Sequence, residues 1–221
     1  MGLDMYMDRV KKIDGMTLRQ IMITAEYIDY TDRGNKYANC SFKDWCGKNE
    51  DDVCKDRIDD VKANIHTHYA AWDTEKKYGH DGISDGVAYW RKANAIHNWF
   101  VENCGGGIDE CQLMEISKEQ LEELLDTAKK VKEASILVDG KINNGYTFKD
   151  GKEVPIMEDG KYIKDPWVAK QLLPTTSGFF FGGTEYDQWY LDDIDSTIKQ
   201  ITEILETTDF DNEYITYQAS W

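Results

Sequence analysis

Apolar residues recur at helical spacing from Tyr89 to Phe100, which makes this stretch the most informative part of the chain. At 100° per residue, one broad apolar stripe contains Tyr89, Trp90, Ala93, Ile96, Phe100 and Val101. His97 lies inside this stripe. Along one edge of it, at spacings i, i+3 and i+7, follow the polar residues Arg91, Asn94 and Asn98. The pattern predicts a buried helix over residues 87–103 with a row of polar side chains on one side.

The remaining hydrophobic patterns predict an α+β fold. Alternating segments indicate strands near residues 2–10, 111–116, 178–182 and 213–221. Helical spacing predicts further helices over residues 117–133 and 185–206. Ser117 and Gln120 form a capping box before the first of these, and Thr184 and Asp187 form one before the second. The segment from Thr17 to Asp29 fits both a short helix and a strand. We therefore expect a mainly antiparallel sheet covered on one face by about three helices.

Two segments interrupt this pattern. Residues 30–85 have no clear periodicity and are interpreted as an irregular insertion. Residues 135–163 are interpreted as a small β-meander, because turn-forming pairs recur between β-leaning pieces at Asp139-Gly140, Asn144-Gly145, Asp150-Gly151 and Asp159-Gly160. With 221 residues the chain is long enough for one core, and we expect a single domain over residues 1–221 that includes both insertions.

The composition is strongly acidic, and this limits the classes of partner. Asp and Glu number 42 against 26 Lys and Arg, which gives a net charge of −16. Phosphate backbones are bound by grouped basic residues, so we expect no direct nucleic-acid binding. Acidic residues such as Asp192, Asp193 and Asp195 fall outside the apolar stripe of their helix and are expected on a solvated face. An alternative is that the acids mimic a nucleic acid or dock on a basic partner.

No export signal or long apolar segment is present, so we expect a cytoplasmic protein without a membrane span. Five cysteines in such a protein are expected to be reduced. Cys40, Cys46 and Cys54, followed by His66 and His68, leave a structural zinc site open, since zinc binds four sulfur or nitrogen ligands. None of these cysteines forms a closely spaced pair, so free thiols, surface histidines and no cofactor are favoured.

Gly182 and Gly183 precede the predicted helix at 185–206. A glycine turn that opens a helix exposes backbone N–H groups at the positive end of the helix dipole, and these can bind a phosphate or a carboxylate. The alternative is that the glycines only form the turn, since Thr184 and Asp187 already satisfy some of these N–H groups. His97 is either a hydrogen-bonded core histidine or a general base.

The chain has only five arginines, and Arg91 lies beside a buried stripe, so it either pairs with a structural acid or faces a ligand anion. Because sequential elements are usually neighbours, we expect the glycine turn and the polar row to meet at one end of the sheet. Trp90 or Tyr186 would stack on the ligand there. The predicted ligand-binding residues are Trp90, Arg91, Asn94, His97, Asn98, Gly182, Gly183, Thr184 and Tyr186.

Several motifs are also similar to a known family. The opening Met-Gly-Leu-Asp-Met-Tyr, the blocks at residues 88–103 and 172–187, and the closing strand resemble a family of proteins common in bacteriophages and prophages. About half of the chain takes part in this resemblance, whereas residues 30–85 and the β-rich segment depart from it. The resemblance implies a phage setting and a compact core, and it supplies no catalytic residues.

Three functions are compatible with the sequence. The first is binding of a small anionic ligand, such as a nucleotide or phosphorylated metabolite, which in a phage would sequester a host signal or defence nucleotide. The second is an acidic inhibitor that docks on a host protein. The third is a small hydrolase or transferase with His97 as base, although no nucleophile and orienting group accompany it at a recognisable spacing. We favour them in this order, and a homo-oligomer is left open.

Overall fold

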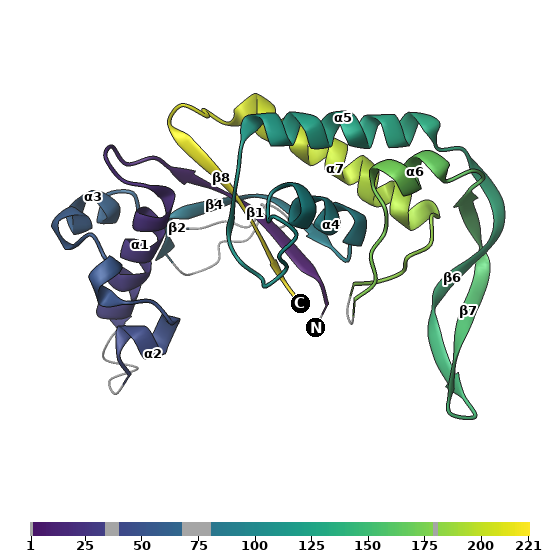
Figure 1. The fold of residues 1–221 in the computed structure, drawn as a ribbon, viewed down its shortest axis with the longest axis horizontal. Coiled ribbons are helices and arrows are strands. Elements are labelled where there is room, and N and C mark those ends of the chain that lie inside the picture. The colour runs from purple at the N-terminus through teal and green to yellow at the C-terminus, as the bar shows by residue number, and fades with distance from the viewer. Residues whose placement is uncertain (1, 34–39, 68–80, 179–180) are drawn as a thin grey trace. The chain divides into compact units, whose positions relative to one another are not determined.

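The computed structural model describes residues 2–33, 40–67, 81–178 and 181–221 and confirms the α+β class. Four antiparallel strands form a sheet in the order β4-β1-β8-β5 (Figure 1). Their bounds are β1 (Asp4–Lys11), β4 (Ser84–Arg91), β5 (Met114–Ile116) and β8 (Glu213–Ser220). In β1 the buried residues Met5 and Met7 alternate with half-buried ones, as the period of two predicted.

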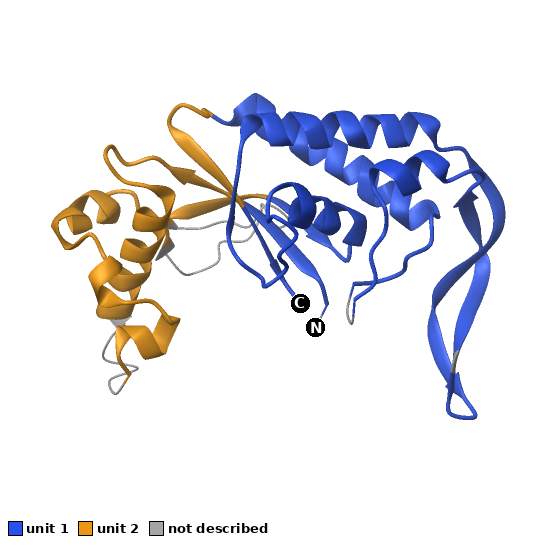
Figure 2. Cartoon of the chain, viewed as in Figure 1, with its two compact units in different colours: residues 1–7, 88–208, 217–221 blue, residues 8–87, 209–216 orange. Residues whose placement is uncertain are grey.

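The described residues divide into two compact units (Figure 2). Unit 1 comprises residues 1–7, 88–208 and 217–221, and unit 2 comprises residues 8–87 and 209–216. Strands β1, β4 and β8 contribute residues to both units. A single domain over the whole chain stays a prediction.

The described part of unit 1 contains four helices, which are α4 (Asn94–Asn103), α5 (Lys118–Ala134), α6 (Trp167–Leu172) and α7 (Gln188–Thr207). The long helices α5 and α7 pack side by side (Figure 1). The predicted capping box of α5 is confirmed, because the Ser117 side chain accepts a hydrogen bond from the Gln120 backbone and the Gln120 side chain accepts one from the Ser117 backbone. Within the described ranges, no helix is both long and apolar enough to cross a membrane.

The predicted helix over residues 87–103 is wrong in its first half. Residues up to Arg91 belong to strand β4, and α4 begins only at Asn94. Ala88 and Trp90 are both buried, which is the alternation of a strand, and the N–H group of Lys92 donates a hydrogen bond to the carbonyl of Leu3 beside β1. A short apolar run fits both periods, and pairing with β1 decided the outcome.

Helices α4 and α7 both pack against strands of the sheet within unit 1. The ring of Phe100 on α4 stacks on Tyr217 of β8, with ring centroids 4.0 Å apart. The indole N–H of Trp90 on β4 donates a hydrogen bond of 3.0 Å to Thr197 on α7. The first contact packs α4 on β8, and the second ties the end of β4 to α7.

The second aromatic segment also differs from the prediction. Residues 178 and 181–182 are not in a strand, and residues 179–180 lie outside the described part of the chain. Helix α7 begins at Gln188 rather than near residue 185, because its N-cap is Asp187 and not Thr184. The predicted apolar stripe is confirmed at Tyr190, Ile194 and Ile201, which are all buried.

The β-rich segment is one long hairpin of β6 (Leu137–Lys149) and β7 (Lys152–Ile163). Its turn is Asp150-Gly151, where both residues have positive φ, as a type I′ turn requires. Gly140 and Gly160 are paired in mid-strand instead of forming turns, and a Cβ at Gly140 would meet the ring of Tyr162. Asn144-Gly145 lies at a register shift between the strands.

Unit 2 contains the predicted irregular insertion. The ambiguous segment after Thr17 is a helix, α1 (Leu18–Arg33). The shorter elements are α2 (Phe42–Cys46), two 3-10 turns (Glu50–Asp52 and Lys55–Arg57), α3 (Ile58–Lys62), β2 (His66–Thr67) and β3 (Asp81–Gly82). Ile21 and Val61 belong to one apolar cluster of this unit, and Ile23 and Phe42 belong to another. Strands β2 and β3 pair with each other in antiparallel orientation.

Candidate functional site

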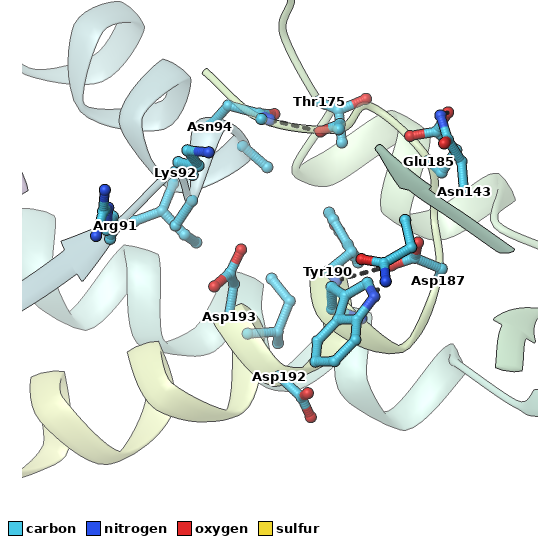
Figure 3. A pocket seen from close by; sticks show the side chains of 18 of the residues that line it. Arg91, Lys92, Asn94, Asn143, Thr175, Glu185, Asp187, Tyr190, Asp192 and Asp193 are labelled. Carbon is cyan, nitrogen blue, oxygen red and sulfur yellow. Dashed lines mark hydrogen bonds between the residues drawn. The ribbon is translucent and has the colours of Figure 1, made fainter. Parts of the chain in front are cut away.

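A pocket of about 700 Å³ lies in unit 1 (Figure 3). It is formed by the turn between β4 and α4, the loop around residues 175 and 182–185, the hairpin β6–β7 and the first two turns of α7. Its volume falls within the range of about 300–1,000 Å³ that is typical of small-molecule sites. The hairpin is held in place because the N–H group of Ile163 donates to the carbonyl of Tyr186, just before α7.

The turn between β4 and α4 places two adjacent basic residues at the edge of this pocket, Arg91 and Lys92, which we call the basic pair. The guanidinium of Arg91 extends away from the middle of the pocket (Figure 3). Lys92 has a φ of 61°, which is the left-handed conformation that ends the strand abruptly. The Arg91 side chain is 61% exposed, and its Nε atom is 3.8 Å from a carboxylate oxygen of Asp4, so their ion pair is loose. Among the described residues, Lys92 forms no ion pair.

Asn94 ties the neighbouring loop to this turn. It is 4% exposed, and its amide donates to the carbonyls of Phe181 (3.1 Å) and Gly183 (2.7 Å). Its side-chain oxygen accepts from the N–H group of Thr176 at 3.0 Å. Both amide hydrogens and the oxygen are therefore engaged with the backbone. These hydrogen bonds hold a loop that is not part of a sheet. Asn94 therefore positions this loop at the pocket.

The start of α7 does not offer the anion site that the sequence predicted. Gly182 and Gly183 line the pocket but lie several residues before Gln188, so their turn does not open the helix. The carboxylate of Asp187 already accepts hydrogen bonds from the N–H groups of Trp189 (2.9 Å) and Tyr190 (3.2 Å). The protein's own carboxylate thus occupies the positive end of the helix.

Asp192 and Asp193, which we call the acidic pair, both belong to the lining of the pocket. Asp192 is exposed, as expected for a solvated face, whereas Asp193 is half-buried. The carboxylate of Asp193 points into the pocket (Figure 3). Burial, with repulsion from Asp192 and Asp187, raises the pKa of Asp193 from 3.8 to about 7. Burial likewise raises the pKa of Asp187. The third acid, Asp195, forms an ion pair of 2.7 Å with Lys132.

Two exposed aromatic side chains also line the pocket. Trp189 at the start of α7 is 49% exposed, and Tyr146 on the hairpin is 57% exposed. Tyrosine and tryptophan are enriched in binding sites, because each combines a large apolar ring with a polar group. Both side chains offer a surface on which a flat group of a ligand can stack.

His97 lies in the core and outside this pocket. It is 1% exposed, and its Nδ1 and Nε2 atoms contact the Tyr217 hydroxyl (2.8 Å) and the Asp109 carboxylate (3.0 Å). In the neutral ring, Nε2 donates to the Asp109 carboxylate and Nδ1 accepts from the Tyr217 hydroxyl. Burial raises the pKa of Tyr217 well above 10, which keeps this donor neutral. Both ring nitrogens are engaged, as in a hydrogen-bonded core histidine.

The structure thus brings together four of the nine predicted residues, namely Arg91, Asn94, Gly182 and Gly183. His97 and Asn98 line a separate cavity of about 340 Å³, and Trp90 is buried against α7. Thr184 and Tyr186 line neither cavity, and Tyr186 instead accepts from the N–H group of Thr175.

Sequence reasoning missed Lys92, Tyr146, Trp189, Asp192 and Asp193. Spacing on α7 could have grouped the last three, since i, i+3 and i+4 share one side of a helix.

The candidate zinc ligands are not brought together. In the described part of the chain, no three His, Cys, Asp or Glu side chains are placed to hold a metal ion. Cys40, Cys46 and Cys54 are free thiols, and the ring of His66 is held by the carbonyl of Asn64 and the carboxylate of Asp85. His68 lies outside the described residues.

Comparisons with known proteins leave the function to be argued from this geometry. No protein-family model matches the chain, and neither the curated proteins nor the solved structures gave a match.

Proposed function

We propose that this protein binds a small anionic ligand in the pocket of unit 1, with the acid group of the ligand beside Arg91 and Lys92. The observation that supports this most is the basic pair at the edge of a ligand-sized pocket, where, among the described residues, only the loose contact with Asp4 balances either charge. Arginine and lysine side chains that are not engaged in close ion pairs are well suited to bind phosphate or carboxylate groups.

The surroundings favour a ligand that also has a ring. Trp189 and Tyr146 provide exposed aromatic surface in the same pocket, while Asn94 and Gly182 hold the loop against the basic pair. Nucleotides and phosphorylated ring metabolites combine an anionic group with such a ring. We further propose, from the resemblance to phage proteins, that such binding would sequester a host signal or defence nucleotide in the host cytoplasm.

A thermal-shift screen tests this proposal. The wild type would be tested against nucleotides, cyclic nucleotides, sugar phosphates and inorganic phosphate, and at saturating ligand a specific anion should raise Tm by several degrees. Arg91→Gln and Lys92→Gln should each weaken binding about ten-fold, while Lys199→Gln, which removes an exposed cation outside the pocket, should not. The proposal fails if no anion stabilises the protein, or if the three variants bind alike.

Docking on a host protein is the second candidate, and the hairpin favours it. The register of β6 and β7 places Tyr146, Phe148 and Met157 on one face, and all three are at least 50% exposed. Exposed apolar surface of this kind is typical of protein interfaces. Replacing Phe148 and Met157 with serine should then abolish capture of a host protein, and unchanged capture would exclude this face.

A further inference from the structure

We infer that the ligand of this pocket is a zwitterion, with its acid group facing Arg91 and Lys92 and a cationic amino group facing Asp192 and Asp193. This inference rests on the proposed function and adds the class of ligand to it. It comes from the distribution of charge around the pocket, in which the basic pair and the acidic pair belong to different elements, the β4–α4 turn and helix α7.

The balance of charge opposes a ligand that is only anionic. Four carboxylates line the pocket, from Glu185, Asp187, Asp192 and Asp193, against the two cations of the basic pair. Two of these acids are engaged by backbone groups, since Asp187 caps α7 and Glu185 accepts from the N–H group of Thr184. The acidic pair has no cationic partner among the described residues. An anion bound at the basic pair would therefore be repelled by uncompensated carboxylates.

Asp193 is the residue that a cationic group would relieve most. No described residue donates a hydrogen bond to its carboxylate, and the side chain is half-buried and directed into the pocket (Figure 3). Burial and the nearby Asp192 and Asp187 raise its pKa, so the surrounding protein groups stabilise the ionised form poorly. A ligand ammonium group would supply both the hydrogen bonds and the opposite charge that are missing there. A hydroxyl group in the same place would supply only a hydrogen bond.

The neighbouring aromatic surface supports the same class of ligand. Trp189 precedes Asp192 and Asp193 by three and four residues on α7, so its side chain lies on the same side of this helix. An indole ring attracts a cation on its face as well as stacking on a flat ring. A ring bearing an amine at one end and a phosphate or carboxylate at the other would match the acidic pair, the aromatic surface and the basic pair together.

Matched probes test the inference by isothermal titration calorimetry. The first series is phosphotyramine, 4-ethylphenyl phosphate, which lacks the amine, and tyramine, which lacks the phosphate. The second series is glucosamine 6-phosphate, glucose 6-phosphate and glucosamine. In at least one series, the zwitterion should bind at least ten-fold more tightly than the compound that lacks the amine and the compound that lacks the phosphate. The inference is overturned if the amine-free phosphate binds as tightly as the zwitterion in each series.

Variants of α7 separate this inference from the function on which it rests. Asp193→Asn should weaken the zwitterion about ten-fold and leave the amine-free phosphate unchanged or slightly tighter, because repulsion is removed. Glu203→Gln, which neutralises an exposed acid on the same helix, should change neither. If Asp193→Asn weakens both phosphates equally, the ammonium contact is wrong. If the zwitterionic and the amine-free phosphate bind equally and Arg91→Gln weakens both, the proposed function stands and only the zwitterion is rejected. The proposed function fails as well if no phosphate binds. It also fails if tyramine or glucosamine binds as tightly as the phosphate compound of its series.

Discussion

Replacing Asp193 with asparagine should stabilise the unliganded protein at pH 8. Burial and the nearby acids raise the pKa of this carboxyl from 3.8 to about 7. Between these two values the folded state holds a proton that the unfolded state has lost, so stability falls as the pH rises. Above pH 7 the folded protein must accommodate an ionised carboxylate next to Asp192 and Asp187. Asparagine has nearly the same shape without this charge, so the variant should not lose stability as the pH rises above 7.

The size of the effect follows from the shift in pKa. A rise from 3.8 to about 7 is roughly three units at about 1.4 kcal/mol each, which sets a ceiling of about 4 kcal/mol. The carboxylate lines an open pocket, where water screens the repulsion, and we expect about half of the ceiling, or ~2 kcal/mol. For a chain of this length, ~2 kcal/mol corresponds to a rise in Tm of about 4–8 °C.

Thermal unfolding of wild type and Asp193→Asn between pH 4 and pH 8 measures this directly. The difference in Tm should be largest at pH 8 and should become small near pH 4, because the folded-state carboxyl is protonated there and the unfolded-state carboxyl begins to take up its proton as well. Glu203→Gln serves as the control, since it removes a carboxylate from an exposed position of the same helix and should change Tm little at any pH. A variant less stable than wild type at pH 8, or a difference independent of pH, would refute the reasoning.

Two further substitutions test how the loop is held beside the basic pair. Asn94→Ala should cost about 2–4 kcal/mol in urea unfolding, because it leaves three backbone groups without their partner, whereas Asn98→Ala should cost much less. Gly182→Ala should lower Tm, since residue 182 has a φ of 91° and a new Cβ would lie 3.1 Å from the Cβ of Lys92. Gly183→Ala is its control, because the Cβ there would meet only the mobile end of the Glu185 side chain. Equal effects within either pair would contradict the roles assigned to Asn94 and Gly182.

The elements that sequence analysis placed well are those whose signals are local. Helix α5 begins directly after Ser117 because the capping box needs only residues three positions apart. Strand β1 follows the alternation of Met5 and Met7, and β8 is found within a residue or two of its predicted bounds. In each case the chain itself contains the partner groups that decide the structure.

The predictions are wrong where the structure of a segment depends on contacts with a segment distant in the sequence. The run around Trp90 fits a helix by its own periodicity, and it becomes a strand because β1, more than 80 residues earlier, offers backbone partners. Gly140 and Gly160 look like turn residues, but facing each other across β6 and β7 they leave room for Tyr162 and Ile142. Local propensity gives no information on either partner.

The acidic pair shows why the candidate site could be predicted only in part. A helical wheel separates the apolar stripe of α7 from its polar side, and it places Asp192 and Asp193 correctly off the stripe. It cannot tell whether that polar side faces water or another element. Here the β4–α4 turn and the hairpin line the same pocket as α7. The carboxylates of α7 therefore share this pocket with Arg91 and Lys92 instead of facing only water. The opposition of charges on which the proposed ligand depends is therefore a product of tertiary structure, and it exists only if the hairpin and the turn are both in place.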